Sequence, residues 1–303
     1  MDFAHVPVMF DEVLSSFDNK PSVFVDLTSG GGGHDAGVLE KYPNVRAVLV
    51  DRDTDAVAHL KEKFASFPNV TVVHAPFSEI DKVMFLLQIP KADIIFADLG
   101  VSSFQFDTPH RGFSMQKEGP MDMRMDKTSQ LTALDFIKNS TEGELRNILS
   151  LYAQEREAGT VARTLKRCAE EGMTTTLQFA DEIRKAKRYA KKWIDPSTQV
   201  FMALRMAVND ELGELETALK KAFPLLSNKG IMGVITFHST EDRIVKNFFR
   251  DRKNRVPFYV DEKDAVPFCC EDSFSVEMIN PSEDECGRNP RARSAKLRIL
   301  KRG

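Results

Sequence analysis

Apolar positions follow two different periodicities over the first hundred residues. Short apolar runs of the kind that form buried strands occupy residues 22–26, 46–51, 70–74 and 92–98. Between these runs, apolar residues recur at helical spacing over residues 35–41, 54–67 and 79–88. Continuously apolar strands separated by amphipathic helices are typical of a parallel sheet covered on both faces. The pattern therefore predicts an α/β domain.

Three of the four predicted strands end in an acidic residue. These residues are Asp26, Asp51 and Asp98. Ligands of open parallel sheets bind outside the carboxyl ends of the strands. We therefore expect the three carboxyl groups to lie along one ligand-binding edge.

The pattern changes after about residue 110, where no strand of similar quality follows. Helical spacing covers residues 129–139, 141–151, 155–171 and 177–192. Thr141 and Glu144 have the spacing of a capping box, and Thr176 precedes the next helix as a capping residue. We expect residues 111–198 to form an inserted all-helical domain, which interrupts a sheet domain formed by residues 1–110 and 199–303.

The chain after the insert is expected to return to the sheet. The pattern predicts one long helix over residues 199–223, a buried strand over 230–237 and a helix over 241–251. The tail from about residue 256 is irregular and ends in a short edge strand at residues 297–300. This arrangement puts the insert beside the strand ends, where a substrate would bind.

A glycine cluster, Gly30–Gly33, follows the first predicted strand and opens a helix. Gly31, Gly33 and Ala36 satisfy the dinucleotide motif, so the motif alone fits either a dinucleotide or S-adenosylmethionine. Asp35 would repel a pyrophosphate at the helix N-terminus, which favours a cationic ligand such as S-adenosylmethionine. A glycine-rich turn without a ligand is the remaining alternative.

The segment after the fourth strand carries uncharged hydrogen-bonding side chains, among them Ser102 and Gln105. In such sheets this is where a methyl donor and its acceptor meet. An ordinary strand-to-loop transition is the alternative interpretation.

Charge and cysteine content limit the classes of partner. With 42 Lys+Arg against 45 Asp+Glu, the net charge of −3 excludes a globally basic nucleic-acid binder but allows local basic patches. Two such patches, residues 184–192 with Tyr189 and Trp193 among or beside them, and residues 288–302, suit phosphates and stacked bases. The four cysteines contain no Cys-x-x-Cys pair, so we expect no metal site. No apolar run is long enough to cross a membrane and the N-terminus has no leader, so we expect a cytoplasmic protein without a membrane partner.

Nine motifs together carry a family resemblance that covers nearly the whole chain. They lie at residues 5–9, 26–34, 51–53, 98–103, 111–114, 119–126, 201–211, 237–243 and 289–298. In these motifs the chain resembles the RsmH/MraW family of ribosomal small-subunit RNA (cytosine-N4)-methyltransferases. The chain departs from the family at Asp35, where a serine is usual, and at residues 195–200, where one basic charge is lost.

The resemblance implies a Rossmann-like class I methyltransferase sheet with a helical insert for substrate recognition. It implies transfer of a methyl group from S-adenosylmethionine to N4 of a decoding-centre cytidine in 16S ribosomal RNA. The sequence leaves open whether the substrate is free RNA or the assembled 30S subunit, and whether the protein is a homodimer. The cofactor contacts implied by the family fall on Gly32, Gly33, His34, Asp51, Phe77, Asp98 and Gln105.

The chemistry requires a polar clamp, because the lone pair of the cytosine amine is delocalised into the ring. A clamp that accepts the amine hydrogens turns the lone pair toward the methyl carbon, and positioning supplies much of the rate. The candidate catalytic residues are Asp98, Ser102, His238 and Glu241. His238 either takes up the released proton or is a buried imidazole bonded to the backbone. We also expect Asp122 and Arg124 to form an ion pair in a segment that closes the site.

Two other classes of function compete with this hypothesis. An NAD-dependent oxidoreductase would use the same glycine loop, but it needs a catalytic Tyr-Lys or His-Asp pair that the sequence does not reveal. A non-enzymatic RNA-binding assembly factor would bind RNA without binding S-adenosylmethionine. Neither alternative accounts for the full set of motifs.

Overall fold

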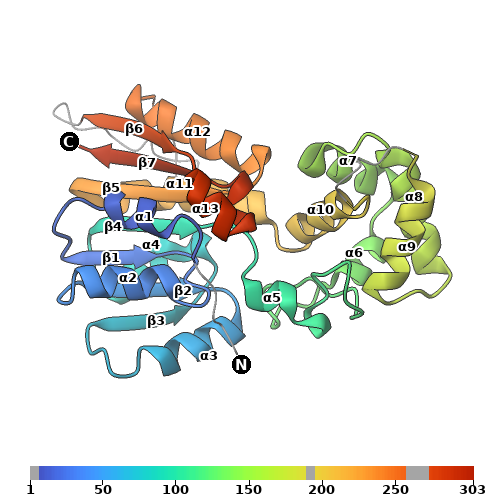
Figure 1. The fold of residues 1–303 in the computed structure, drawn as a ribbon, viewed down its shortest axis with the longest axis horizontal. Helices are drawn as coiled ribbons and strands as arrows, with labels where there is room; N and C mark the ends of the chain where they lie inside the picture. The colour runs from blue at the N-terminus through green and yellow to red at the C-terminus, as the bar shows by residue number, and fades with distance from the viewer. Residues whose placement is uncertain (1–6, 189–194, 257–272) are drawn as a thin grey trace. The chain divides into compact units, whose positions relative to one another are not determined.

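A seven-stranded sheet forms the first part of the fold. The structure is a computed structural model that describes residues 7–188, 195–256 and 273–303. The strand order is β3-β2-β1-β4-β5-β7-β6, visible as a stack in Figure 1. The strands are β1 (Val23–Asp26), β2 (Arg46–Asp51), β3 (Val70–His74), β4 (Ala92–Asp98), β5 (Leu226–Thr236), β6 (Phe274–Ile279) and β7 (Lys296–Arg302). Neighbours from β3 to β5 are parallel, and β7 is antiparallel to both β5 and β6.

Both faces of this sheet are buried, as the continuous apolar runs predict. Val48 and Val50 of β2 belong to a core with apolar residues of α4 (Ile80–Leu86), α11 (Glu211–Ala222) and α12 (Ser239–Lys253). Ala47 and Leu49 of the same strand belong to the opposite core, with residues of α1 (Phe10–Ser16), α2 (Gly33–Lys41) and α3 (Thr54–Lys63). Each fully buried aliphatic or aromatic side chain contributes about 1.5–3 kcal/mol. The predicted Rossmann-like α/β class is confirmed.

The helices of the middle of the chain share a separate apolar core. They are α5 (Ser103–Asp107), α6 (Ala133–Asn139), α7 (Glu142–Ala153), α8 (Ala158–Glu170), α9 (Thr176–Ala186) and α10 (Thr198–Val208). The chain divides into one compact unit of residues 1–100 with 212–303 and a second of residues 101–211. These bounds differ from the expected 111–198, because Phe106 of α5 and Phe201 of α10 pack into the helical core.

Helix caps agree with the sequence at one position and differ at another. The capping box of Thr141 with Glu144 is confirmed at the start of α7. Thr175, not Thr176, caps α9, because the Thr175 side chain accepts from the backbone N–H of Gln178. Thr176 is fully buried, and its hydroxyl donates to the carbonyl oxygen of Lys117 at 2.7 Å.

The single helix expected over residues 199–223 is wrong, since the chain forms α10 and α11 with a break between them. Asn209 at the break is buried; its side-chain oxygen accepts from Met125 N at 2.7 Å and its amide donates to Met123 O at 2.7 Å. Asp210 follows with a φ of 46°. The Asn209 side chain therefore bonds the backbone of Met123 and Met125 at the point where α10 ends.

The predicted edge strand at residues 297–300 is also wrong in its place. It forms the middle of β7, which lies between β5 and β6, and β6 is the edge strand. The strand β6 escaped prediction because most of its residues are exposed or half-buried, which gives no continuous apolar run. The tail also contains the short helix α13 (Glu283–Arg288). In the described ranges, no helix has the length and apolarity required to span a bilayer.

Candidate active site

Three acids end adjacent strands of the first unit. Asp51, Asp26 and Asp98 are the last residues of β2, β1 and β4, which are neighbours in that order. Asp26 pairs in register with Leu49 and Phe96, and Asp98 pairs with Ile235 of β5. Parallel pairing therefore brings the three predicted carboxyl groups to the same edge of the sheet.

The glycine loop between β1 and α2 has a backbone that only glycine adopts easily. Gly30 and Gly32 have φ angles of 52° and 69°. A Cβ on Gly32 would lie 2.8 Å from side-chain atoms of Leu60 and Phe64, and one on Gly33 would lie 2.4 Å from Pro7 Cγ. Packing against α3 and against the segment before α1 therefore requires glycine at these positions, whatever the loop binds.

Asp51 ties the glycine loop to the tip of β2. Its Oδ2 accepts from Gly30 N at 2.7 Å and its Oδ1 accepts from Asp53 N at 2.8 Å. Burial raises the pKa of Asp51 to about 6, and the two backbone hydrogen bonds oppose this rise. Each oxygen keeps a further lone pair, so the carboxylate can still accept from the two hydroxyls of a ribose.

His34, the first-turn residue of α2, is a neutral and buried imidazole. Burial lowers the pKa of His34 to about 4. The contact of 3.0 Å between Nε2 and Val8 O requires Nε2 to carry the proton, because a carbonyl oxygen only accepts. The lone pair on Nδ1 then faces Asp98, whose Oδ2 lies 3.8 Å away. His34 thus lines the Asp98 side of the site without bringing a charge.

Asp98 is a partly open carboxyl group with an unusual protonation equilibrium. Its side chain is 25% exposed, and its backbone N–H donates to Thr28 Oγ1 at 2.7 Å. Burial raises its pKa well above the usual range, and the charges of Asp26 and Glu241 add to this effect. Its Oδ1 has no hydrogen-bond partner among the described residues. Asp98 can therefore accept from, or when protonated donate to, a bound molecule.

The argument that the charge of Asp35 favours a cationic ligand over a pyrophosphate does not hold in the structure. Asp35 is fully buried beneath the glycine loop, and burial together with the neighbouring Asp26 raises its pKa well above the usual range. Burial also raises the pKa of Asp26, to about 7, although Thr28 N donates to its Oδ1 at 2.8 Å. The pair holds at least part of a proton near neutral pH, so the charge of Asp35 no longer discriminates between cofactors.

Glu241 and His238 lie where β5 leads into α12. Glu241 is 2% exposed, and its Oε2 accepts from Phe237 N at 3.1 Å and from His238 N at 3.4 Å. His238 Nδ1 lies 3.4 Å from Glu241 Oε1. The Glu241 carboxylate therefore caps α12 and shapes the β5 tip, and its charge also acts on Asp98.

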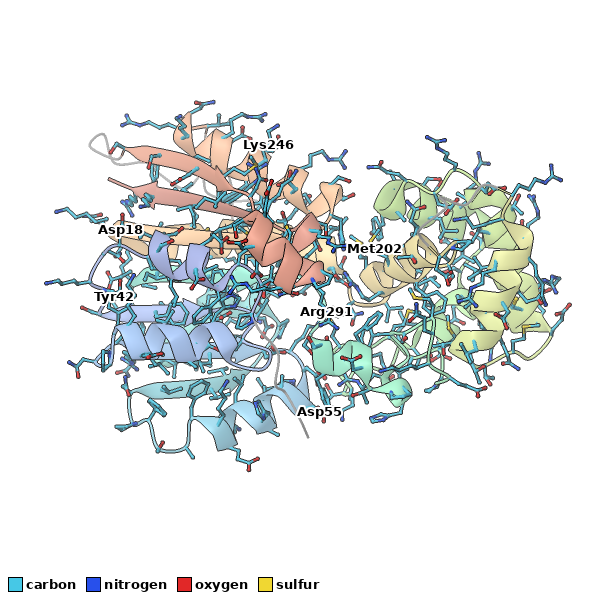
Figure 2. The ribbon with its side chains drawn as sticks, viewed as in Figure 1. Asp18, Tyr42, Asp55, Met202, Lys246 and Arg291 are labelled. Carbon is cyan, nitrogen blue, oxygen red and sulfur yellow. The ribbon has the colours of Figure 1, made fainter. Side chains whose placement is uncertain are left out.

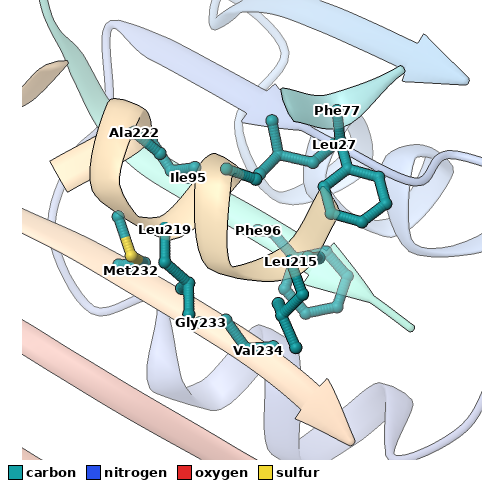
Figure 3. A pocket seen from close by; sticks show the side chains of 12 residues that line it. Leu27, Phe77, Ile95, Phe96, Leu215, Leu219, Ala222, Met232, Gly233 and Val234 are labelled. Carbon is teal, nitrogen blue, oxygen red and sulfur yellow. The ribbon is translucent and has the colours of Figure 1, made fainter. Parts of the chain in front are cut away.

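Phe77 is buried beneath the third strand tip. It opens the short 3-10 helix η1 (Phe77–Glu79), is 9% exposed and lines an apolar cavity of about 10 Å³ with Leu27 and Leu215 (Figure 3). A volume this small and apolar leaves no room for more than a single water molecule. The described contacts of Phe77 are thus with the core of the first unit.

Ser102 and Gln105 belong to the second unit, where they cap α5. Ser102 Oγ accepts from Gln105 N at 3.2 Å, and Gln105 Oε1 accepts from Ser102 N at 3.0 Å. Gln105 is 5% exposed. These two hydrogen bonds fix the start of α5, four residues along the chain from Asp98.

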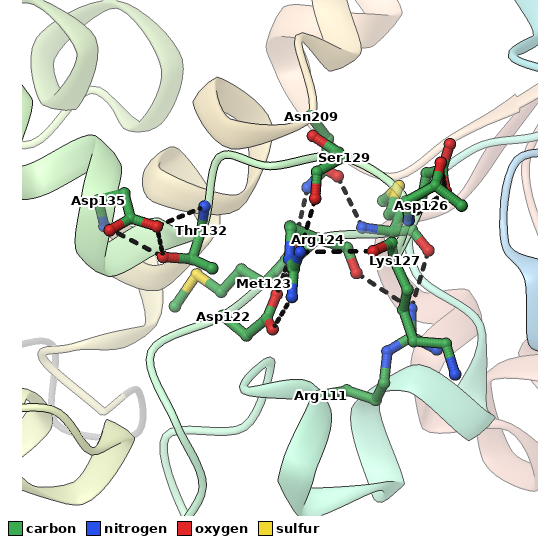
Figure 4. Close-up of polar contacts among 12 residues, drawn as sticks. Arg111, Asp122, Met123, Arg124, Asp126, Lys127, Ser129, Thr132, Asp135 and Asn209 are labelled. Atoms are coloured by element: carbon green, nitrogen blue, oxygen red, sulfur yellow. Dashed lines mark hydrogen bonds and ion pairs between the residues drawn. The ribbon is translucent and has the colours of Figure 1, made fainter.

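The predicted ion pair of Asp122 with Arg124 is confirmed in the second unit (Figure 4). Arg124 Nε and Nη2 donate to the two carboxylate oxygens of Asp122, each at 2.7 Å. Arg124 Nη1 also donates to Ser129 O at 2.6 Å, and Arg111 Nη2 donates to Met125 O at 2.8 Å. These bonds hold the segment in a defined loop.

Much of the predicted basic patch of the insert is used in ion pairs. Arg184 binds Asp195 and Asp181, and Lys187 forms a buried pair with Glu155 at 2.6 Å. Tyr189, Lys191, Lys192 and Trp193 lie outside the described residues. RNA binding by this patch stays a prediction. In the tail patch, Arg298 binds Asp242 at 2.7 Å.

Two contributors to the site had escaped the sequence analysis. Thr28 bonds the backbone of Asp98, and Lys63 of α3 donates to the carbonyl oxygens of Gly31 and Gly32 at 2.8 Å. The position of Thr28, two residues after a strand-ending acid, is a signal that was available. Nothing in the sequence marks Lys63 as part of the site, because a lysine at the end of an amphipathic helix is common.

The strand order, the glycine loop and the acidic strand tips define a Rossmann-like domain with its ligand-binding edge at the carboxyl ends of the strands. The model of the MraW methylase family matches residues 2–303, and the chain belongs to this family. The protein is a methyltransferase.

Relatives of known name cover the whole chain. The Ribosomal RNA small subunit methyltransferase H of Caldicellulosiruptor saccharolyticus is 40% identical over 305 residues, which cover 99% of each chain. The protein of the same name from Carboxydothermus hydrogenoformans is 41% identical over 310 residues, which cover 100% of this chain and 99% of the relative. An rRNA methylase structure from Streptococcus thermophilus is 9% identical with a TM-score of 0.43, covering 99% of this chain and 98% of that one.

Proposed function

We propose that this methyltransferase transfers a methyl group from S-adenosylmethionine to the exocyclic N4 amine of a cytidine in small-subunit ribosomal RNA. Relatives at about 40% identity over the full chain carry the name of a small-subunit ribosomal RNA methyltransferase. The observation that carries the chemistry is Asp98, a strand-tip carboxyl group with one oxygen unpartnered among the described residues.

The residues of the first unit fit S-adenosylmethionine. Asp51 retains acceptor capacity on both oxygens for a ribose, and Asp98 Oδ1 is a buried acceptor without a described partner. Gly32, Gly33 and His34 shape the loop between them. Phe77 of the first unit and Gln105 of the second unit are the further proposed contacts. When bound, this cofactor supplies a methyl carbon activated by a positively charged sulfur.

Asp98 is proposed to hold the cytosine amine during transfer. An ionised Asp98 accepts a hydrogen bond from N4–H, which orients the nitrogen lone pair, and it takes up the proton that N4 loses. Burial and the charges of Asp26 and Glu241 raise the pKa of Asp98 above that of an ordinary carboxyl group, which makes the ionised form a stronger base. His34 Nδ1 lies 3.8 Å from Asp98 Oδ2. Once the Asp98 carboxyl group is protonated, Nδ1 presents its lone pair to that proton.

The other proposed catalytic residues act around this carboxyl group. Glu241 raises the pKa of Asp98 by its charge and fixes the β5 tip, while His238 beside it offers a second proton acceptor. Ser102 is proposed to bind the base from the start of α5. The helical unit of residues 101–211 is proposed to recognise the RNA, and the 121–126 loop to close the site.

The substrate is proposed to be ribosomal RNA in the cytoplasm, either free or within the 30S subunit. A homodimer is part of the same proposal. The NAD-dependent alternative gains nothing from the structure beyond the glycine loop that it shares.

One experiment tests the proposed reaction. The protein is incubated with methyl-labelled S-adenosylmethionine and, in parallel, with 30S subunits that lack the mark and with protein-free 16S RNA. Mass spectrometry of nucleosides then locates the label. We expect N4-methylcytidine; label on a cytosine ring carbon, on another base or nowhere would refute the proposal, and the two substrates distinguish RNA from the assembled particle.

A further inference from the structure

Four basic residues form one stripe along α12. Arg243, Lys246, Arg250 and Lys253 are all exposed, and their spacing of three, four and three residues puts them on one face of the helix. Figure 2 shows Lys246 on this helix. The opposite face carries the buried Val245 and Phe249, so packing against the sheet fixes the stripe toward solvent.

Within the described part of the chain, the acidic residues of α12 pair with only one of the four cations of this stripe, Arg250. Asp242 binds Arg298 at 2.7 Å and Lys296 at 3.3 Å, both from β7. Asp251 binds Arg250 at 2.8 Å. Arg243, Lys246 and Lys253 form no ion pair with any residue that the structure describes. The stripe therefore concentrates positive charge on a chain whose net charge is −3.

The stripe starts beside the proposed active site. The strand β5 runs parallel to β4, Ile235 pairs with Asp98, and α12 begins three residues after the end of β5. Arg243 lies about one turn into the helix, and ten residues of helix carry the stripe about 15 Å to Lys253. That length spans several nucleotides at about 3.4 Å of axial spacing per phosphate on one strand.

We propose that this basic stripe binds the phosphate backbone of the RNA next to the methylated nucleotide. The proposal rests on the proposed function, because an RNA whose cytidine reaches Asp98 must continue past the β5 tip. Phosphate contacts fix the position of a nucleic acid without reading its sequence, and they suit a regularly spaced row of Lys and Arg. The four side chains thus supply register and affinity, and they take no part in the chemistry.

The test compares two triple variants with the same loss of charge. Arg243→Gln/Lys246→Gln/Lys253→Gln removes the unpaired cations of the stripe and keeps residues with good helix propensity. Lys20→Gln/Lys91→Gln/Lys229→Gln is the matched control, since these exposed lysines lie before or at the start of strands, at the opposite edge of the sheet. The affinity for protein-free 16S RNA fragments is measured between 50 and 200 mM salt.

We expect the stripe variant to bind RNA at least about 10-fold more weakly at low salt. The slope of log affinity against log salt should become shallower by about two units, because each of the three lost phosphate contacts accounts for about 0.7. In methyl transfer, KM for RNA should rise while kcat at saturating RNA and the affinity for S-adenosylmethionine stay unchanged.

Three results would overturn the proposal. The first is an equal salt slope for the stripe and control variants. The second is a stripe variant that loses binding to 30S subunits but not to free RNA, which would indicate a contact with a ribosomal protein. The third is wild-type protein that binds no RNA. Failure of the proposed function is distinguishable, because it would appear as wild-type protein that binds RNA through the stripe but does not methylate N4 of cytidine.

Discussion

At the scale of single residues, the site is a set of carboxyl groups whose protonation is set by burial. Asp51, Asp26, Asp35 and Asp98 all have pKa values raised mainly by burial, and Asp26 acts on both Asp35 and Asp98. The sequence predicted that acids meet at the strand tips. It did not predict which acid is buried. Asp35 lies in the first turn of α2, where acidic residues are common and usually exposed, so its position gives no sign of burial.

Asp98 is expected to be indispensable for transfer. We predict that Asp98→Ala and Asp98→Asn each lower kcat by about 100-fold or more, because both remove the base. The thermal midpoint should not fall, since each change removes a carboxyl group whose burial is costly. Single-turnover assays and melting curves measure both effects, and a fully active variant would mean that the active site is placed wrongly.

Binding of S-adenosylmethionine should depend on pH through Asp51. As the pH falls through about 6, the carboxyl group of the free protein takes up a proton and loses acceptor capacity for ribose hydroxyls. We therefore predict weaker binding below pH 6, with proton release on binding, by titration calorimetry in buffers of different ionisation enthalpy. The Asp51→Asn variant should bind more weakly with a flatter profile; affinity that rises as the pH falls would contradict this role.

The buried acid pair should make the ligand-free protein less stable as the pH rises. Asp26 and Asp35 have folded-state pKa values above the unfolded value, so the folded state binds more protons, and stability is lost as the pH passes the folded values, about 7 for Asp26. We predict that Asp35→Asn raises the melting temperature at pH 7.5 by a few degrees and has a smaller effect at pH 5. A lower melting temperature at pH 7.5 would show that the Asp35 charge is compensated in the fold.

At the scale of elements, three of the apolar strands were predictable to the residue, whereas β1 begins one residue later than expected and β5 begins four residues earlier. The bounds of β2, β3 and β4 equal those expected. For β2 and β4 the reason is burial on both faces, which gives a continuous apolar run that ends sharply. The division between α10 and α11 was not predictable, since neither glycine nor proline marks it. The reason for the break is a long-range one, the bonds from Asn209 to residues 123 and 125.

Removal of the Asn209 side chain should therefore destabilise the helical unit. We predict that Asn209→Ala costs about 1–3 kcal/mol in the free energy of unfolding, because Met125 N and Met123 O are left buried without this partner. Asn247→Ala on α12 is the matched control and should change stability by less than about 0.5 kcal/mol. Denaturant titrations measure both, and equal effects of the two substitutions would refute this account of the break.

At the scale of the whole molecule, the chain divides into two compact units, each with an apolar core of its own. The unit of residues 1–100 and 212–303 carries the strand tips and glycine loop, and the unit of residues 101–211 has its own core. The sequence indicated an inserted helical segment, because the strand pattern stops and later resumes. The exact limits of the inserted unit depend on whether α5 and α10 pack into the core of the sheet or into the helical core. The apolar periodicity of these two helices does not show which core they join.

The methyl donor is proposed to bind across the tips of β1, β2 and β4. A crystal structure of the protein with S-adenosylhomocysteine tests it most directly. We predict ribose hydroxyls within hydrogen-bond distance of Asp51 and the sulfur end of the ligand beside the glycine loop and Asp98. A ligand bound elsewhere, or strand tips filled by other side chains of the protein, would contradict the account.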